Sequence, residues 1–402
     1  MIFKLAFYHA DRSAQPLPVL TKIRHKGESM SRKWLVSVLT AGILMFPTFA
    51  VFAEGTQDEG AVGAVYTMTN DNTGNQVVMF NRDEDGVLTR AGSISTGGLG
   101  SGGAGVLDPL GSQGSIVLSS DARWLLAVNA GSNEISVFRV LPNGLLLVDK
   151  VGSGGVFPVS VTISHDLVYV LNAREGSHSP NITGFTLGHT GELTPLADST
   201  RPLSAGPLAA FAQVGFDPEG ETLVVTDKGD KTILVYPVGE DGRPAASPAV
   251  SASNGFTPFG LIFDERGHLL VVEAGTNAVS SYDVSRDGTL QVISPSVANG
   301  QKAACWIAGN ERGNVFTANP GSATISAYTE EARDGTLTLL AGAAGSGVSP
   351  LDLAIARGRF LYALDPKAGG IDAFRIEEDG SLTSLGTVAG GLSVFAQGVA
   401  AR

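Results

Sequence analysis

The stretch that decides the fold is FTPFGLIFDERGHLLVVEAGTNAVSSYDVSRDGTLQ, residues Phe256–Gln291. It contains two short apolar runs, Leu261–Phe263 and Leu269–Val272, which are separated by a turn. An alternating run, Asn277–Val284, comes next, and an Asp287-Gly288 turn then leads into a fourth run. Short runs of this kind, separated by Asp-Gly and similar turns, are typical of antiparallel β-strands. The stretch therefore predicts four consecutive β-strands that are joined by tight turns.

The same pattern recurs along the chain. The turn ahead of the fourth strand aligns in seven copies, which are Asp85-Gly86, Asn143-Gly144, Thr190-Gly191, Asp241-Gly242, Asp287-Gly288, Asp334-Gly335 and Asp379-Gly380. From the first copy to the last, the mean period is 49 residues. Four strands in a repeat of this length are the signature of a β-propeller, in which each repeat forms one blade. We therefore predict an all-β fold, a seven-bladed β-propeller with four-stranded blades.

The two ends of the propeller are expected to meet. The first copy begins near Ala61 with its second strand and has no inner strand ahead of it. The end of the chain, Phe395–Ala401 (FAQGVAA), resembles the inner strand of the fourth copy, Phe211–Phe216 (FAQVGF). We expect the C-terminal strand to pair into the first blade and close the ring, because closure removes an unpaired sheet edge.

The N-terminus has the pattern of a secretory signal peptide. An apolar run at residues 34–46 follows Arg32-Lys33 and precedes small residues around Val51 and Ala53. The run is too short to span a membrane. We predict that residues 30–53 are a signal peptide cleaved after Ala53, that residues 1–29 are a mis-assigned upstream extension, and that residues 54–402 form one propeller domain. The expected location is periplasmic or extracellular.

Composition narrows the classes of partner. The formal net charge of −12 repels phosphate backbones and anionic lipids, so neither a nucleic acid nor a membrane is an expected partner. The single cysteine, Cys305, excludes an intramolecular disulfide and is expected to be a small buried apolar residue. The six histidines are scattered without metal-ligand spacing, so we expect no metal and no cofactor. We expect a monomer.

Two sets of equivalent positions are candidates for function. One polar position ends the second strand of every blade, at Asn70, Asn129, Asn172, Asp227, Glu273, Asn319 and Asp365. A ligand rim and turn capping are both open, and the sevenfold recurrence favours capping. The inner strands carry a second set, at Ser115, Ser160, Gln213, Gly260, Trp306, Asp352 and Gln397. This set is polar and nearly uncharged, which suits a neutral polar ligand or ordered water.

From these sets, and from the charged loop residues expected at the channel mouth, we take six candidate ligand-binding residues, namely Gln213, Trp306, Asp352, Gln397, Asp227 and Lys228. A glycine-rich segment, residues 97–114, interrupts the repeat between the first two blades. No helix pattern follows it, so it is not a phosphate-binding loop of the usual kind. We expect a flexible loop beside the channel mouth that is able to act as a lid.

The repeat with its DGTLQ, DGTLT and DGSLT turns resembles the seven-bladed lactonase family, which includes 6-phosphogluconolactonase-type enzymes and carboxymuconate cyclases. The resemblance covers about residues 61–402. It implies a histidine, a glutamate and two arginines that bind an acidic lactone and move a proton. In this chain Ala212 stands at the histidine position, Phe259 and Cys305 at the arginine positions, and Ala274, next to Glu273, at the glutamate position.

Because other residues stand at the positions of the implied histidine, arginines and glutamate, two functions remain open. The first is a non-catalytic platform that holds a protein, a glycan or a small polar ligand at the channel mouth. The alternative is a lactone hydrolase that opens the ring of a sugar lactone or another lactone, as 6-phosphogluconolactonase does. For the alternative, the candidate catalytic residues are Glu273, Arg174 and His178.

Overall fold

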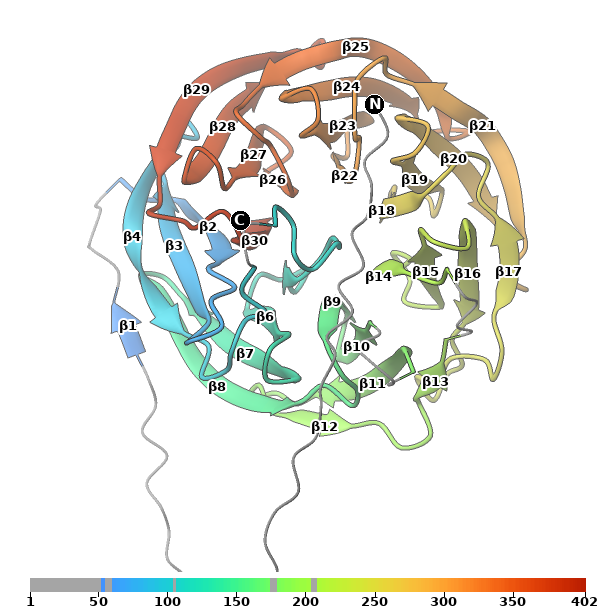
Figure 1. Cartoon of the computed structure of the whole chain (residues 1–402), viewed down its shortest axis with the longest axis horizontal. Coiled ribbons are helices and arrows are strands. Elements are labelled where there is room, and N and C mark those ends of the chain that lie inside the picture. The colour runs from blue at the N-terminus through green and yellow to red at the C-terminus, as the bar shows by residue number, and fades with distance from the viewer. Residues whose placement is uncertain (1–51, 55–59, 104–105, 174–178, 204–207) are drawn as a thin grey trace, which may run out of the picture. The chain divides into compact units, whose positions relative to one another are not determined.

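The structure is a computed structural model, and it describes residues 52–54, 60–103, 106–173, 179–203 and 208–402. These residues lie in one compact unit. Their strands form seven antiparallel sheets arranged around a central axis (Figure 1). No helix occurs in the described ranges, and so none there is long and apolar enough to cross a membrane. The structure confirms the predicted all-β, seven-bladed propeller with four-stranded blades.

The blades are numbered from the N-terminus, and their strands are given from the axis outward. Blades one to three consist of β30 (Gln397–Ala401), β2 (Gly63–Met68), β3 (Gln76–Arg82) and β4 (Leu88–Ser95); β5 (Ile116–Leu118), β6 (Trp124–Asn129), β7 (Glu134–Leu141) and β8 (Gly144–Gly152); and β9 (Pro158–Ser164), β10 (Leu167–Asn172), β11 (Asn181–Leu187) and β12 (Leu193–Pro195). Two short strands complete these sheets, which are β1 (Phe52–Glu54) beside β8 and β13 (Arg201–Pro202) beside β11.

Blades four to seven follow the same order without additions. They consist of β14 (Phe211–Phe216), β15 (Thr222–Asp227), β16 (Thr232–Pro237) and β17 (Ala249–Ala252); β18 (Pro258–Phe263), β19 (Leu269–Glu273), β20 (Ala278–Val284) and β21 (Leu290–Ala298); β22 (Trp306–Gly309), β23 (Asn314–Asn319), β24 (Thr324–Glu331) and β25 (Thr336–Ser346); and β26 (Leu353–Ala356), β27 (Phe360–Asp365), β28 (Gly370–Ile376) and β29 (Leu382–Ala389).

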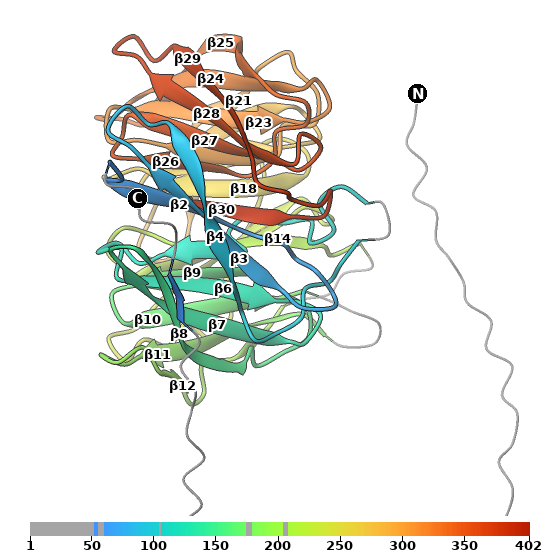
Figure 2. The same ribbon diagram turned by 90° about the vertical axis from the view of Figure 1, so that its left-hand side faces the viewer.

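The C-terminal strand closes the ring, as predicted. β30 pairs antiparallel with β2, with Thr67 opposite Val399. The Thr67 hydroxyl donates a 2.6 Å hydrogen bond to the carbonyl of Gly398. Figure 1 shows the C-terminus beside β2, on the inner side of the first blade, and the turned view of Figure 2 shows the same neighbours. Blade one is therefore built from both ends of the propeller.

The predicted cleavage point falls within a paired strand. β1 lies along β8 at the outer edge of blade two, and Ala53 is opposite Leu145. The rest of the predicted signal peptide and all of residues 1–29 lie outside the described residues. Cleavage after Ala53 would remove two of the three residues of β1.

The core lies between neighbouring blades, which pack face to face. Every residue of β6, β23 and β27 is buried. Six tyrosines are among the largest fully buried side chains, at positions Tyr66, Tyr169, Tyr236, Tyr282, Tyr328 and Tyr362. Burying a large apolar side chain contributes about 1.5–3 kcal/mol. The alternating strands that carry these residues thus supply the main stabilisation of the propeller.

The recurring Asp-Gly turns have a packing role in addition to their turn role. Gly86 has φ +85°, a conformation that favours glycine, and an added Cβ there would overlap the ring of Phe360 in blade seven. The hydroxyl of Tyr362 donates a 2.9 Å hydrogen bond to the Gly86 carbonyl. Gly335 of blade six packs against His268 of blade five in the same way. The turn of each of these two blades therefore docks on the preceding blade.

Of the seven polar residues that end the second strands, Asp227 and Asp365 cap backbone N–H groups, whereas Asn129 and Asn319 bond to neighbouring side chains. All seven are buried. The Asp227 carboxylate accepts hydrogen bonds from the backbone N–H groups of Ala210 (2.9 Å) and Gly229 (3.0 Å). The Asp365 carboxylate accepts them from Val348 and from Ser349 (2.9 Å). Each of these two carboxylates binds backbone N–H groups of the loop that arrives from the preceding blade, as the capping interpretation expects.

Candidate functional site

A segment of the chain lies inside the central channel. We call residues 106–114, between β4 and β5, the channel segment. The Gln113 amide donates a 2.8 Å hydrogen bond to the carbonyl of Ile307 and accepts one of 3.0 Å from the N–H of Ile307. The indole of Trp306 donates a 2.9 Å hydrogen bond to the Ser112 carbonyl. In Figure 1 the teal chain ahead of β6 reaches toward the centre of the ring.

This arrangement corrects the expectation of a flexible lid. The backbone N–H of Gln113 donates to the Ala212 carbonyl of blade four (3.3 Å), and its side chain bonds to blade six. The Ser112 hydroxyl donates a 2.8 Å hydrogen bond to the Val159 carbonyl of blade three. The first half of the segment 97–114 is rich in glycine. Its second half carries polar groups that form hydrogen bonds with backbone groups of the inner strands.

Two groups of opposite charge bond to the same glycine of the channel segment. The Asp108 carboxylate accepts a 2.9 Å hydrogen bond from the N–H of Gly111. The Lys228 ammonium, on the loop after β15, donates a hydrogen bond to the carbonyl of the same glycine. It also lies 5.0 Å from the centre of the Phe259 ring. Both side chains are half-buried, so solvent reaches them only in part.

The pKa values of this pair are displaced toward one another. Burial raises the pKa of Asp108 to about 6, and the charge of Lys228 opposes that rise. Burial lowers the pKa of Lys228, and the charge of Asp108 is the largest opposing effect. Displaced pKa values in a cleft are typical of groups that transfer protons or stabilise charge. We therefore take Asp108 and Lys228 as the centre of the candidate site.

Apolar side chains surround the lysine. The rings of Phe259 and Trp306 meet edge to face with their centres 5.3 Å apart. Cys305 is half-buried and packs against the same apolar cluster. Burial, followed by the charge of Asp108, raises the pKa of the Cys305 thiol to about 12. The thiol therefore stays protonated, and an unionised thiol is a poor nucleophile.

Asp352 is a second carboxyl group in the channel. It is 4% exposed, and its carboxylate accepts a 3.0 Å hydrogen bond from the N–H of Leu353. Burial is the main cause that raises the pKa of Asp352 to about 8, and the charge of Asp108 adds to it. At neutral pH this group is mostly protonated, so it acts as a neutral hydrogen-bonding group.

The other predicted ligand-binding residues are engaged by the protein itself. The Gln213 amide accepts a 2.7 Å hydrogen bond from the N–H of Leu261 and donates one of 3.0 Å to its carbonyl, which links blades four and five. The Gln397 amide donates to the Ala396 carbonyl (3.0 Å). Trp306 holds the channel segment, and Asp227 is a cap. Of the six residues, Lys228 and Asp352 carry the ionisable groups that the channel brings near Asp108.

Glu273 lies in a different environment, inside blade five. It is fully buried, and its Oε1 accepts hydrogen bonds from the N–H of Gly255 (2.6 Å) and from the hydroxyls of Ser253 and Ser280. Its Oε2 accepts a 2.9 Å hydrogen bond from the Ser296 hydroxyl. This geometry serves as a cap between strands and gives Glu273 no contact with the Asp108–Lys228 pair.

The two remaining predicted catalytic residues, Arg174 and His178, lie outside the described residues. The catalytic roles of Glu273, Arg174 and His178 stay predictions. Sequence reasoning missed Asp108 and Gln113. The available signal was Asp108-Pro109 in a segment that breaks the repeat next to the channel.

Comparison with known proteins places the fold in a family. The model of the family described as "Lactonase, 7-bladed beta-propeller" matches residues 64–206 and 210–396. The chain therefore belongs to the seven-bladed β-propeller lactonase family. No curated protein matches it.

Solved structures share the fold at low sequence identity. A candidate 6-phosphogluconolactonase from Bacteroides fragilis is 18% identical with a TM-score of 0.65, over 86% of this chain and 99% of that chain. The periplasmic gluconolactonase of Pseudomonas aeruginosa is 18% identical with a TM-score of 0.63, over 82% of this chain and 98% of that chain. A protein from Lactobacillus plantarum is 17% identical with a TM-score of 0.67, over 85% and 99%. At these identities the likeness establishes the fold alone.

Proposed function

We propose that this protein is a lactone hydrolase, with Asp108 as the general base and Lys228 as the group that stabilises the oxyanion. Family membership favours this alternative over the non-catalytic platform. The observation that carries the proposal is the meeting of Asp108 and Lys228 at Gly111 inside the channel. Phe259 and Cys305, at the positions where the resemblance implies two arginines, are close to Lys228. The lysine supplies a positive charge there from a different part of the chain.

The proposed reaction is addition of water to the lactone carbonyl. The Asp108 carboxylate accepts a proton from the attacking water, and the water oxygen bonds to the carbonyl carbon. The Lys228 ammonium faces the carbonyl oxygen, where negative charge develops in the tetrahedral intermediate. The bond between the carbon and the ring oxygen then breaks, and the ring oxygen takes the proton that Asp108 holds. The product is an open-chain hydroxy acid, and Asp108 is again ionised.

The substrate class is also a proposal. A site with one cation and mostly uncharged polar surroundings suits an uncharged sugar lactone or a simple γ-lactone better than a phosphorylated one, which calls for several cations. The names of two structural neighbours, a gluconolactonase and a candidate 6-phosphogluconolactonase, support lactones as a class. Glucono-δ-lactone and γ-butyrolactone are therefore the first probes, and 6-phosphogluconolactone is the third.

The test is acid release in a pH-stat with these three probes, after subtraction of spontaneous hydrolysis. Lys228→Met is expected to lower kcat by about 10²–10³-fold, as the loss of one oxyanion donor does. Lys231→Met is the matched control, because Lys231 is exposed and its ammonium lies over Phe256 instead of Phe259. Equal rates for the two variants would refute the role of Lys228.

The binding platform is the second candidate, and one observation favours it. The channel segment fills part of the space in which a ligand of an open channel would lie, since it bonds to blades three, four and six. Absence of turnover for all three lactones, together with calorimetric binding of a sugar or glycan, would support this function. Binding that is abolished by Asp108→Asn would place the ligand at the same site.

Secretion is a proposal that is supported by the signal-peptide pattern of residues 30–53. N-terminal sequencing of the protein recovered from the periplasm or the medium tests it. A first residue at Glu54 agrees with the prediction. A peptide from residues 1–25 in the precursor would overturn the start at Met30.

A further inference from the structure

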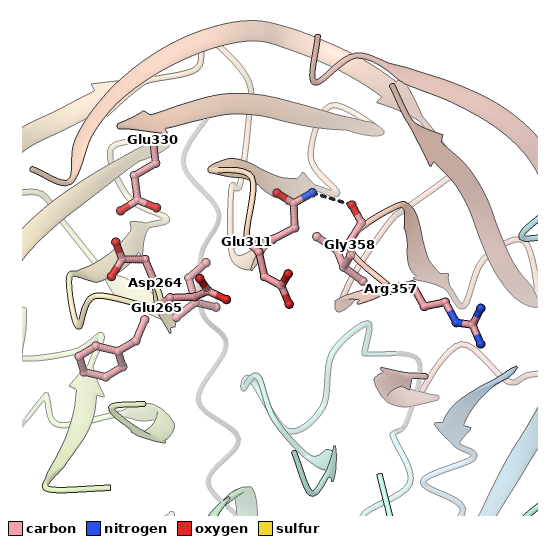
Figure 3. Close-up of a pocket in the computed structure, with 11 residues that line it drawn as sticks. Asp264, Glu265, Glu311, Glu330, Arg357 and Gly358 are labelled. Carbon is pink, nitrogen blue, oxygen red and sulfur yellow. Dashed lines mark hydrogen bonds between the residues drawn. The ribbon is translucent and has the colours of Figure 1, made fainter. Parts of the chain in front are cut away.

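A polar pocket of about 310 Å³ lies at the opposite end of the blades from the channel segment. It is bordered by the turns that follow β18, β22 and β26 and by the end of β24. Its ionisable lining residues are Asp264, Glu265, Glu311, Glu330 and Arg357. Figure 3 shows these side chains around the pocket. Four of the five are acidic, so the pocket attracts a cation.

Two lining residues of this pocket, Asp264 and Glu330, form with the neighbouring His268 an arrangement that is typical of metal ligands. Asp264, His268 and Glu330 each offer one ligand atom, and these atoms lie within 4.8 Å of one another. The Asp264 carboxylate lies 2.7 Å from Nδ1 of His268, and these side chains are 12% and 13% exposed. Asp264 and His268 belong to blade five, whereas Glu330 comes from β24 of blade six. In Figure 3 the carboxylates of Asp264 and Glu330 face one another.

The Glu330 carboxylate has one oxygen without a hydrogen-bond partner among the described residues. Its Oε1 is buried and accepts no hydrogen bond from any described residue. A buried acceptor without a partner destabilises the folded state, and more so when the group is charged. Figure 3 shows the guanidinium of Arg357 at the far side of the pocket, where it points away from Glu330. Burial, followed by the charge of Asp264, raises the pKa of Glu330 to about 8. A carboxyl group in these surroundings favours either a proton or a cation.

We propose that Asp264, His268 and Glu330 bind a divalent transition-metal ion. One imidazole nitrogen and two carboxylate oxygens suit Zn²⁺ or Mn²⁺ better than Mg²⁺ or Ca²⁺, which prefer oxygen ligands alone. The ion satisfies the free oxygen of Glu330 and offsets the two negative charges. Because the ligands come from two blades, the ion joins blade five to blade six. The remaining coordination positions face the pocket and are open to water.

This site is separate from the proposed lactonase centre. Its ligands lie on the turns after first strands and at the end of a third strand, whereas Lys228 follows a second strand. In antiparallel blades these two sets of connections lie at opposite ends. The metal therefore takes no part in the proposed hydrolysis, and the two proposals fail independently.

The experiment uses the full propeller after treatment with a chelator. Calorimetric titration with Zn²⁺ and with Mn²⁺ is expected to show one ion bound per chain, and the melting temperature is expected to rise with ion concentration, because binding to the folded state stabilises it. Absence of one-to-one binding of either ion to the folded protein would overturn the proposal.

Three variants locate the ion. Glu330→Gln and His268→Gln are expected to weaken binding by at least about 100-fold, since even outer partners of metal ligands contribute about 10–100-fold. Glu330→Gln keeps the shape of the side chain, so the variant is expected to fold. Glu311→Gln is the matched control, because Glu311 lines the same pocket outside the ligand set. Wild-type affinity in a folded Glu330→Gln variant would refute the assignment.

Discussion

The ammonium group of Lys228 lies 5.0 Å from the centre of the Phe259 ring. The lactonase resemblance implies an arginine at position 259, where this chain has a phenylalanine. The aromatic ring takes the backbone position of that cation, and a lysine from the loop after β15 lies over the ring. A cation placed in this way gains about 0.5–2 kcal/mol from the ring. The positive charge in the channel is thus held by a different residue and in a different way.

The pairing of Lys228 with Asp108 predicts a bell-shaped pH dependence of lactone turnover. Asp108 must be ionised to accept a proton, so kcat/KM is expected to rise with pH through about 6, where burial places its pKa. Lys228 must be protonated to stabilise the oxyanion. Because burial lowers its pKa, the rate is expected to fall at a lower pH than an exposed lysine would give. Initial rates in a pH-stat measure both limbs.

The Asp108→Asn variant tests whether Asp108 causes the rise of kcat/KM on the acidic side of this profile. This variant is expected to lose about 10²–10⁴-fold in kcat/KM and to lose the rise through pH 6. Asp121→Asn is the control, since that carboxylate is exposed at the β5–β6 turn. If the Asp108→Asn profile keeps the limb near pH 6, another group is the base.

Asp352 predicts a stability that depends on pH. Its carboxyl group ionises near pH 4 in the unfolded chain and near pH 8 in the folded chain. Between these values the unfolded state binds fewer protons than the folded state, so the free energy of unfolding falls as pH rises. The slope from this group is up to about 1.4 kcal/mol per pH unit, and it vanishes above pH 8. Urea unfolding across this range measures the slope.

Asp352→Asn is expected to remove this slope and to raise stability at and above neutral pH. The asparagine oxygen accepts the same hydrogen bond from the N–H of Leu353, and no charge is buried. The comparison variant is Asp379→Asn, in an exposed turn where hydrogen bonds lower the pKa of the carboxyl group. A wild-type slope in Asp352→Asn would show that Asp352 is already ionised in the folded protein.

The fold could be predicted because its determinants are local and repeated. Turns with glycine at the second position and polar strand ends recur in each blade, so one well-marked copy, Phe256–Gln291, indicates the others. The match between Phe395–Ala401 and an inner strand was enough to predict closure, since it depends on the same repeat.

The candidate site could be predicted only in part, because its central contact does not repeat. Lys228 was recognisable as a charged residue on a loop near the channel. Its partner, Asp108, comes from the connection between blades one and two and crosses to the side of blade four. The strand periodicity contains no information on where an inserted segment goes, and glycines at its start suggested mobility. A capping position and a catalytic position look alike in sequence, so sequence alone does not assign a role to Glu273.

The docking of the Gly86 turn on blade seven predicts that two glycine substitutions lower the free energy of unfolding by different amounts. Gly86→Ala is expected to destabilise in two ways, since φ is positive there and the new Cβ overlaps the ring of Phe360. Gly267→Ala is the matched control, because its φ of +87° is similar and nothing lies near the added Cβ. Strain alone costs about 1–2 kcal/mol. Urea unfolding should therefore show a larger loss for Gly86→Ala, and equal losses would contradict the packing role of the turn.

Closure of the ring by β30 predicts that the last residues of the chain are required for folding. Removal of residues 397–402 exposes the whole inner edge of β2 and deletes the hydrogen bond between the Thr67 hydroxyl and the Gly398 carbonyl. We expect a product that is insoluble or lacks a cooperative melting transition, because the two ends of the propeller are then no longer joined in the sheet of blade one. Removal of β1 is the matched control, since β1 adds three residues to the outer edge of blade two. That deletion is expected to shift the melting temperature only slightly. A truncated chain that melts like the full chain would mean that the ring closes without β30.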